Sequence, residues 1–208
     1  MQVDAQTGEG YLISQLPHTA VYIMQLNDSY TDVVGEPSDH FLHVAPPEAR
    51  EAPAHFERNG KHYLITSGTT GYHPNPSEVA FAHTWHGPYA VQGDICQDDG
   101  SLTTWNSQVS SVFKVPGKRD LYIALADRWR PELPQNEEGF ETGSAYRAFA
   151  KRFATLFNPA VPFELTEDDK KELRINSSIS EYVWLPLVFE GDRVQIEWRD
   201  EWRLEDFE

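Results

Sequence analysis

The sequence predicts an all-β fold: about three blades of a β-propeller plus closing strands, with a helical insertion. An internal repeat carries this prediction. The segment 11–14, Tyr-Leu-Ile-Ser, recurs as Tyr-Leu-Ile-Thr at 63–66, and looser copies begin at Leu121 and Tyr182. The copies lie roughly 50–60 residues apart, somewhat above the usual period of a four-stranded propeller blade. A closed ring needs at least four blades, so the sequence predicts an incomplete propeller.

The strands are expected in an order that builds hairpins. After a β-rich segment at 19–26, the pair 54–58 and 61–67 is joined by Asn59-Gly60, a two-residue hairpin signal. Segments 78–84 and 89–93 complete that blade. Segments 109–115 and 120–127 are joined by Pro116-Gly117. The last pair is 182–190 and 193–199, with 202–207 behind it.

One segment departs from the β pattern. Apolar residues fall at helical spacing at Tyr146, Phe149, Ala150, Phe153, Leu156 and Phe157. Residues 166–169 look like a helix-capping sequence in front of 170–174. We interpret about 131–178 as a helical insertion in a propeller loop, its aromatic stripe packed on the blades. The chain, 1–208, is then a single partial β-propeller catalytic domain.

Composition excludes several classes of function. The chain has 17 basic and 33 acidic residues, a formal charge of −16, which disfavours nucleic acid and anionic membranes as partners. No apolar run approaches the roughly 20 residues that span a bilayer. Residues 1–10 contain no apolar core of a signal peptide, and the single Cys96 cannot form an internal disulfide, so a cytoplasmic location is expected. The many aromatic residues suit sugar stacking, but β-sheet cores favour them too.

Two segments of the second blade are candidates for chemistry. Glu51 lies just before a strand, where a carboxyl held against apolar neighbours acquires a raised pKa and acts as a general acid; the alternative is a surface glutamate beside Arg50. The loop 67–75 follows a strand and offers hydroxyls and an aromatic ring to a sugar; the alternative is a plain polar turn. Its candidate binding residues are Thr69, Thr70, Gly71, Tyr72 and Asn75.

Two further candidate segments lie in the next blade along the chain. Trp105 and Gln108 flank the start of a strand, where an amide needs hydrogen-bond partners; the alternative is a buried structural amide. Asp127 and Arg128 end a strand, and a strand-end ion pair is the alternative. His40 and His43 have no third ligand at matching spacing, so no metal site is predicted.

Taken in order along the chain, these segments resemble glycoside hydrolase family 43, particularly the branch of exo-β-1,3-galactanases and related galactosidases or arabinofuranosidases. The likeness lies in residues 50–54, 59–68, 70–72, 107–108, 115–118, 127–129 and 182–186. It implies a five-bladed propeller and hydrolysis with inversion, with Glu51 as the general acid. Gln108 matches an amide that replaces the usual aspartate base, which would orient water or act through an imidic tautomer. No cofactor is required, although the family often holds a calcium or sodium ion near the axis.

The resemblance also implies that N-terminal blades are absent from this chain, so the pocket should be open on one side. Exposed sheet edges would then favour self-association. The leading hypothesis is an inverting, exo-acting glycosidase for β-linked galactosyl or arabinofuranosyl residues of an oligosaccharide or polysaccharide. The alternatives are a non-catalytic carbohydrate-binding remnant and a protein-contact propeller that docks through its insertion.

Overall fold

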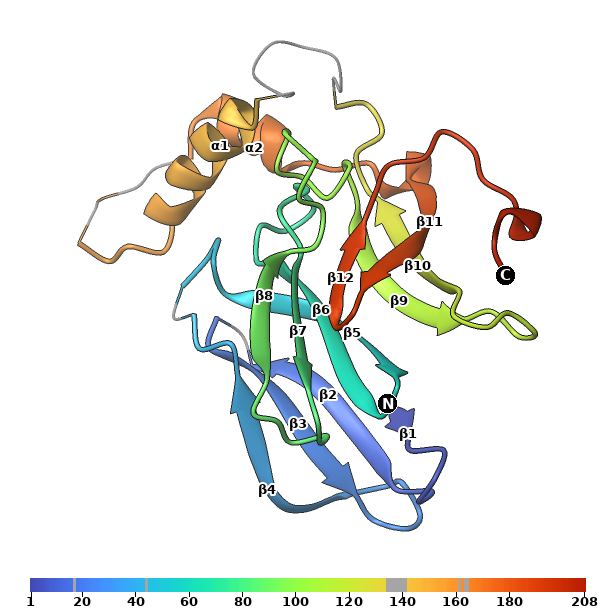
Figure 1. Cartoon of the computed structure of the whole chain (residues 1–208). Coiled ribbons are helices and arrows are strands. Elements are labelled where there is room, and N and C mark those ends of the chain that lie inside the picture. Colours follow the sequence, from blue (N-terminus) through green and yellow to red (C-terminus); the bar gives the residue numbers. More distant parts are fainter. Residues whose placement is uncertain (17, 44, 134–141, 161, 163–164) are drawn as a thin grey trace.

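The computed structural model describes residues 1–16, 18–43, 45–133, 142–160, 162 and 165–208 and contains three four-stranded antiparallel sheets (Figure 1). In each sheet, consecutive strands of the chain are neighbours. The first sheet consists of β1 (Gln2–Val3), β2 (Gly10–Leu16), β3 (Ala20–Leu26) and β4 (Val33–His40). The second consists of β5 (Arg50–Arg58), β6 (Lys61–Gly68), β7 (Glu78–Ala82) and β8 (Ala90–Asp94). The third consists of β9 (Gln108–Lys114), β10 (Tyr122–Arg128), β11 (Glu181–Glu190) and β12 (Arg193–Ile196). The predictions of an all-β fold and of three blade-like units are confirmed.

Three copies of the sequence repeat fall on the equivalent strand of the three sheets. The copies at 11–14, at 63–66 and at Leu121 fall in or at the start of β2, β6 and β10, the second strand of their respective sheets. The copy at Tyr182 lies in β11, which pairs with β10 in the same sheet. It therefore repeats a strand pattern within the third sheet and does not mark a further blade.

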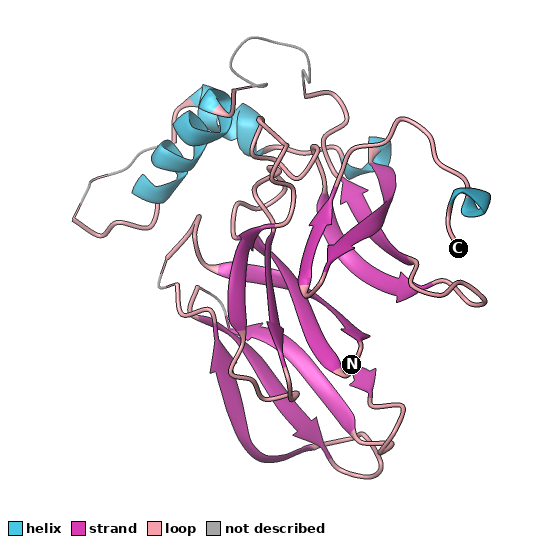
Figure 2. Cartoon of the chain, in the orientation of Figure 1, coloured by secondary structure: helices cyan, strands magenta, loops and turns pink. Residues whose placement is uncertain are grey.

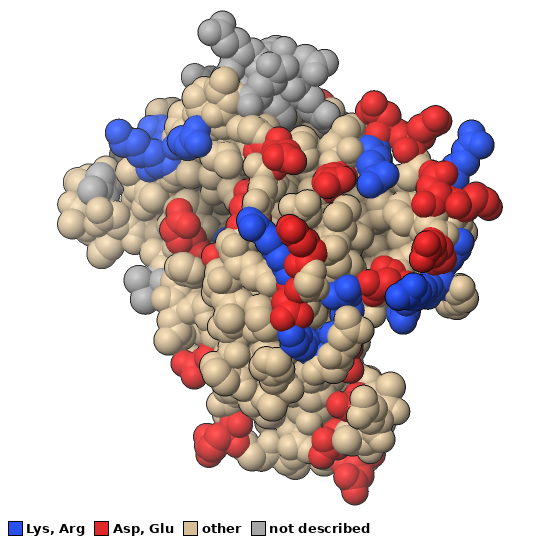
Figure 3. All heavy atoms as spheres, in the orientation of Figure 1, with Lys and Arg blue, Asp and Glu red and all other residues tan. Residues whose placement is uncertain are grey.

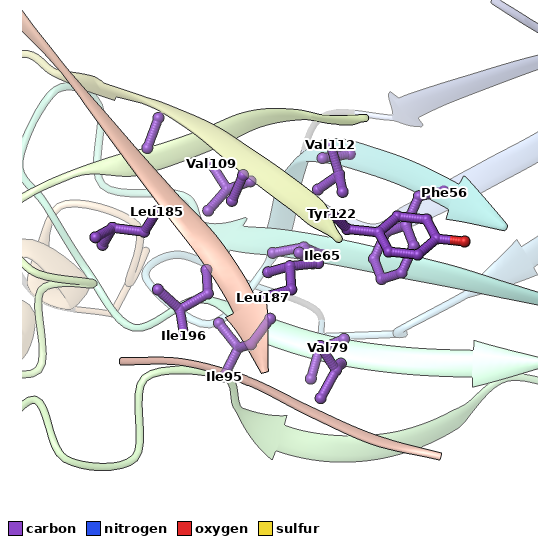
Figure 4. Close-up of a cluster of buried hydrophobic side chains, with 14 of the residues drawn as sticks. Phe56, Ile65, Val79, Ile95, Val109, Val112, Tyr122, Leu185, Leu187 and Ile196 are labelled. Atoms are coloured by element: carbon purple, nitrogen blue, oxygen red, sulfur yellow. The ribbon is translucent and has the colours of Figure 1, made fainter. Parts of the chain in front are cut away.

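The sheets pack face to face, and the second sheet is covered on both sides. Tyr63 and Ile65 of β6 join the core shared with the third sheet, whereas Leu64 joins a smaller cluster with Tyr11 and Ile23 of the first sheet. Figure 4 shows the larger core, with side chains from β5 to β7 meeting those of β9 to β12. Because side chains alternate along a strand, a central blade can be apolar on both faces.

The strand predictions failed at the edges. β4 was not predicted, because Gly35 and Pro37 make Val33–His40 resemble a turn; it lies at the edge of its sheet, where proline is tolerated. β12 ends at Ile196 instead of residue 199. The segment 202–207 contains a 3₁₀ helix, η2 (Leu204–Asp206), and no strand. Among the described residues, no closing strand follows the third sheet.

One face of the third sheet is exposed and aromatic. Along β11, Tyr182 and Trp184 point outward while Val183 and Leu185 are buried. The ring of Phe113 on β9 lies 6.5 Å from that of Trp184. Acidic side chains are spread over all three sheets in the view of Figure 3, as the net charge of −16 requires. None of the described helices combines the length and the apolar character needed to cross a membrane.

Three described helical segments follow one another between β10 and β11 in the chain, outside the sheets, and the first two lie together (Figure 2). They are α1 (Ser144–Thr155), α2 (Glu167–Leu173) and the 3₁₀ helix η1 (Ser177–Ile179). Thr166 and Asp169 form a reciprocal capping box at the start of α2. The ring of Phe149 stacks on His73 at 3.8 Å, and Phe157 lies 5.2 Å from His18. Two rings of the aromatic stripe thus contact loops of the second and first sheets, and Phe157 remains 39% exposed.

Candidate active site

Four strand ends bring the candidate residues together. β5 begins at Arg50 and β6 ends at Gly68, while β9 begins at Gln108 and β10 ends at Arg128. Antiparallel pairing places the start of each strand beside the end of its partner, so all four ends lie at the same end of the second and third sheets. β5 also lies directly against β9.

Glu51 is positioned by a β-bulge. It faces Ser67 of β6, and the register shifts between Glu51 and Ala54. Ala52 has φ of 48° although it is not glycine and precedes a proline, a strained conformation of the kind that concentrates at functional sites. The side chain is half-buried, and this burial raises the pKa of Glu51, partly offset by a hydrogen bond from Gln108 and by the charge of Arg50.

The amide of Gln108 connects this carboxyl to two other side chains. Its Nε2 donates to Oγ of Ser67 over 2.7 Å, and its Oε1 accepts from Nε1 of Trp129 over 3.2 Å. An indole nitrogen only donates, so it fixes which end of the amide is oxygen. The amide nitrogen therefore faces Ser67 and Glu51. The two predicted catalytic residues, Glu51 and Gln108, are thus brought close enough for the amide of Gln108 to lower the pKa of Glu51.

Tyr72 and Trp129 form an aromatic corner beside Gln108. Their rings meet edge to face with centroids 5.2 Å apart, and Tyr72 is 49% exposed. Gly71 precedes Tyr72 with φ of 62°, a left-handed conformation that glycine adopts without strain. An exposed ring next to a polar amide matches the requirements of a sugar-stacking surface.

The other polar residues of the loop 67–75 form hydrogen bonds that stabilise the loop. Asn75 bonds both backbone groups of Gly68, at 2.6 and 2.9 Å, and donates to Oγ1 of Thr70 over 2.7 Å. The hydroxyl of Thr70 donates to the carbonyl of His73, and that of Thr69 to the carbonyl of Ala49. All three side chains are buried. The structure thus gives them a supporting position behind Tyr72, and their predicted contact with sugar remains a prediction.

The four candidates of the third sheet occupy different places. Asp127 is the cross-strand partner of Gln108 and shares its face of the sheet. Trp105 packs against the large core and lies near Trp198, with centroids 6.0 Å apart. Arg128 bonds the carbonyls of Trp105 and Asn106 at 3.2 and 3.3 Å. Trp105 and Arg128 therefore stabilise the approach to β9 and are not brought to Glu51.

A strained loop delivers Gln108 to the site. Leu102, Thr104, Trp105 and Asn106 all have positive φ, between 53° and 59°. The buried carboxylate of Asp99 accepts backbone N–H bonds from Ser101, Thr103 and Trp105 at 2.9–3.0 Å. Charged hydrogen bonds of this kind offset the cost of the left-handed residues.

Sequence reasoning missed three residues of this arrangement. Ser67 and Trp129 bind the Gln108 amide directly. Arg50 is buried and bonds Thr66 through its Nε at 3.0 Å and the carbonyl of Pro76 at 3.3 Å, which fixes the start of β5. All three lie within segments that the sequence singles out, 50–54, 67–75 and 127–129, and hairpin pairing from Asn59-Gly60 places Ser67 close to Glu51.

The resemblance allows a calcium or sodium ion near the axis. Calcium takes six to eight oxygen ligands. In the described part of the chain, one group of three or more His, Cys, Asp and Glu side chains converges, and it consists of His55, Glu57 and His62. This nitrogen-rich set does not fit calcium, and no step of a mechanism is assigned to such an ion.

Comparison with known proteins was informative only at the level of structure. No family model matches the chain, and no curated protein matches it in sequence. A β-1,3-galactosidase of glycoside hydrolase family 43 superposes with a TM-score of 0.67 and 25% identity, covering 99% of this chain and 34% of that chain. The chain has the fold of part of a family 43 glycoside hydrolase. The resemblance predicted from the sequence is confirmed.

Other family 43 enzymes give the same result. The exo-β-1,3-galactanase from Clostridium thermocellum has a TM-score of 0.61 and 24% identity over 94% of this chain and 32% of that chain. The exo-β-1,3-galactanase from Phanerochaete chrysosporium, solved with β-1,3-galactotriose, has a TM-score of 0.60 and 24% identity over 94% of this chain and 34% of that chain. The chain therefore spans about a third of the length of these family 43 structures.

Proposed function

We propose that the chain contributes the catalytic acid of a glycosidase that releases β-1,3-linked galactosyl groups, with Glu51 as that acid. The observation that carries the proposal is the position of Glu51: half-buried at the bulge of β5, with a raised pKa, beside Gln108, Tyr72 and Trp129. A raised pKa favours the protonated form of a carboxyl, which donation to a leaving oxygen requires. The matching fold of β-1,3-galactosidases supports the substrate class.

The role of Gln108 depends on its contact with Glu51. Inverting glycosidases separate acid and base by roughly 6.5–9.5 Å, which leaves room for the attacking water. The amide of Gln108 is within hydrogen-bonding reach of Glu51, so the separation in this structure is shorter. We assign to Gln108 the positioning of Glu51. For Gln108 to orient water in an inverting reaction, a bound sugar must separate the side chains of Gln108 and Glu51.

The proposed substrate is the end of a galactan chain, and arabinofuranosyl groups are the second choice. The aromatic corner of Tyr72 and Trp129 supplies the stacking surface, and Asp127, beside Gln108, supplies an acceptor for sugar hydroxyls. The five-bladed form of the enzyme is also part of the proposal. It rests on the length of the family 43 relatives, of which this chain spans about a third. Self-association through the exposed sheet surfaces would be a second way to complete the pocket.

The decisive experiment is hydrolysis of an aryl β-galactoside and of β-1,3-galactan by the protein and by Glu51→Gln. Loss of the general acid should lower kcat/KM by about 10²–10⁴-fold. Glu36→Gln, at an exposed position on β4, is the matched control and should keep full activity. Proton NMR of the first product shows whether the anomeric configuration inverts. Full activity of Glu51→Gln would remove the assignment.

Sugar binding without turnover is the second candidate function. The closeness of Gln108 to Glu51 favours it, because the attacking water of an inverting reaction needs room between the two side chains. Calorimetry with β-1,3-galactobiose, alongside product analysis, separates the two functions. Heat of binding without product supports the second candidate, and product release supports the first.

A further inference from the structure

Two histidines and a glutamate converge at the far end of the hairpin that carries Glu51. His55 and Glu57 alternate along β5 and so share one face, and His62 of β6 is the cross-strand partner of Glu57. Both histidines are 7% exposed, and Glu57 is half-buried. The face lies toward the first sheet, since Leu64, on the same face of β6, packs with Tyr11 and Ile23.

The two imidazole nitrogens have the spacing of two ligands of one tetrahedral metal ion. Nε2 of His55 and Nδ1 of His62 are 3.2 Å apart. Two nitrogens bound to one tetrahedral zinc at about 2.0–2.1 Å lie roughly 3.3–3.4 Å from each other, so the observed spacing needs almost no adjustment. One ligand atom from each of the three residues lies within 4.8 Å of the others. The carboxylate of Glu57 can therefore complete a two-histidine, one-carboxylate set.

The surroundings favour a cation. Glu57 forms no ion pair with any described residue, and the charge of Asp4 acts on both Glu57 and His62. Asp4 accepts a hydrogen bond from Nε1 of Trp85 over 2.9 Å. Trp85 in turn stacks on His55 at 4.3 Å and lies 4.6 Å from His62. The aromatic ring thus fixes both imidazoles while two carboxylates supply negative charge.

Both histidine rings are buried, and neutral imidazole is the form in which histidine binds a metal. A simple hydrogen bond between the rings also fits the distance. That hydrogen bond alone would leave the half-buried carboxylate of Glu57 without a cation, whereas a bound metal ion supplies one.

We propose that His55, His62 and Glu57 bind a divalent transition metal of the zinc class. The donor set is that of zinc sites with an open fourth position, and calcium and magnesium prefer oxygen ligands. The site lies six residues along β5 from Glu51, roughly 20 Å at the rise of an extended strand. Trp85, which packs on both histidines, donates to Asp4, which directly follows β1 of the first sheet. At that distance from Glu51 the metal takes no part in the proposed glycosidase activity.

The test uses tag-free protein, stripped with a chelator and titrated with Zn²⁺ by calorimetry and with Co²⁺ by visible absorption. We expect one equivalent of Zn²⁺ with a Kd in the micromolar range or below, intense tetrahedral Co²⁺ bands, and a thermal midpoint raised by roughly 5–10 °C at saturation. Ca²⁺ at the same concentration should leave the midpoint unchanged.

Two variants test which side chains bind the ion. Glu57→Gln and His55→Gln should each weaken Zn²⁺ binding by about 100-fold or more, since even supporting residues of metal sites contribute about 10–100-fold. His83→Gln, an exposed histidine just after β7, should bind as the unaltered protein does. The proposal is overturned if the unaltered protein binds no Zn²⁺ at roughly 100 times the expected micromolar Kd. This outcome does not depend on whether any variant folds. The proposal is equally overturned if both ligand variants keep full affinity.

Discussion

The indole nitrogen of Trp129 donates a hydrogen bond to Oε1 of Gln108 across 3.2 Å. Trp129 follows β10 and Gln108 begins β9, so this bond joins the ends of two neighbouring strands. It turns the amide nitrogen toward Ser67 and Glu51. The proposed acid is thus oriented by a chain of side chains from two sheets.

Replacing Trp129 by phenylalanine should release this orientation. The ring remains beside Tyr72, but the amide of Gln108 loses the donor that fixes it. We expect kcat to fall by about 10-fold, the value of one hydrogen bond of about 1.4 kcal/mol, with a small change in KM. Steady-state kinetics on an aryl β-galactoside measure both. Trp198→Phe removes an indole that bonds Asp200 at the surface and should have no such effect.

The pH dependence reports on Glu51. The hydrogen bond from Gln108 lowers the pKa of Glu51, so Gln108→Leu should raise it further. A general acid works only when protonated, so the alkaline limb of the kcat/KM profile should move to higher pH in this variant. The absolute rate should fall, and only the position of the limb is diagnostic. A limb that stays in place or moves to lower pH contradicts the assignment of Glu51.

Asp94, at the end of β8, makes stability depend on pH. Burial raises the pKa of Asp94 from 3.8 to about 6, so the folded protein binds a proton that the unfolded chain releases. Stability should fall as the pH rises from about 4 to about 6 and stay reduced above it. Asp94→Asn removes this loss and should stabilise the protein by about 2–3 kcal/mol at pH 7. Urea unfolding at pH 4 and pH 7 tests it, since the gain must disappear at the lower pH.

Asp99 holds the strained loop before Gln108. An asparagine at this position cannot accept all the N–H bonds from Ser101, Thr103 and Trp105. We expect Asp99→Asn to lower the free energy of unfolding by about 3 kcal/mol and to reduce activity, because Gln108 loses its support. Asp98→Asn, next to it but exposed, is the control and should change neither quantity. Equal behaviour of the two variants would remove Asp99 from this role.

Phe149 of α1 stacks on His73, which belongs to the loop 67–75 of the candidate site. Phe149→Ala should cost about 2 kcal/mol of stability, from lost apolar burial and lost ring stacking. Phe157→Ala, in the same stripe but 39% exposed, should cost about half as much. Limited proteolysis near α1 should accelerate only in the first variant. A larger loss in Phe157→Ala would show that the helix is anchored at its other end.

The sequence by itself determined the hairpins and the order of the strands, because these depend on local turn chemistry and on alternation along each strand. Asn59-Gly60 joins β5 to β6, with Arg58 paired to Lys61. The same pairing, counted back along the hairpin, would set Glu51 against Gly68. The bulge at Ala52 and Pro53 shifts the register by one residue and sets Ser67 there instead. The turn alone does not predict this shift, and β5 packs directly against β9 of the next sheet.

Only the tertiary structure decided which candidates meet. Glu51 and Gln108 are 57 positions apart in the sequence and belong to different sheets, yet the amide of Gln108 lies close enough to lower the pKa of Glu51. Trp105 lies three positions before Gln108 and turns into the core instead, because the run of left-handed residues held by Asp99 reverses the chain there. Local patterns specify what each strand is. Contacts between sheets, which no local pattern encodes, specify which side chains face one another.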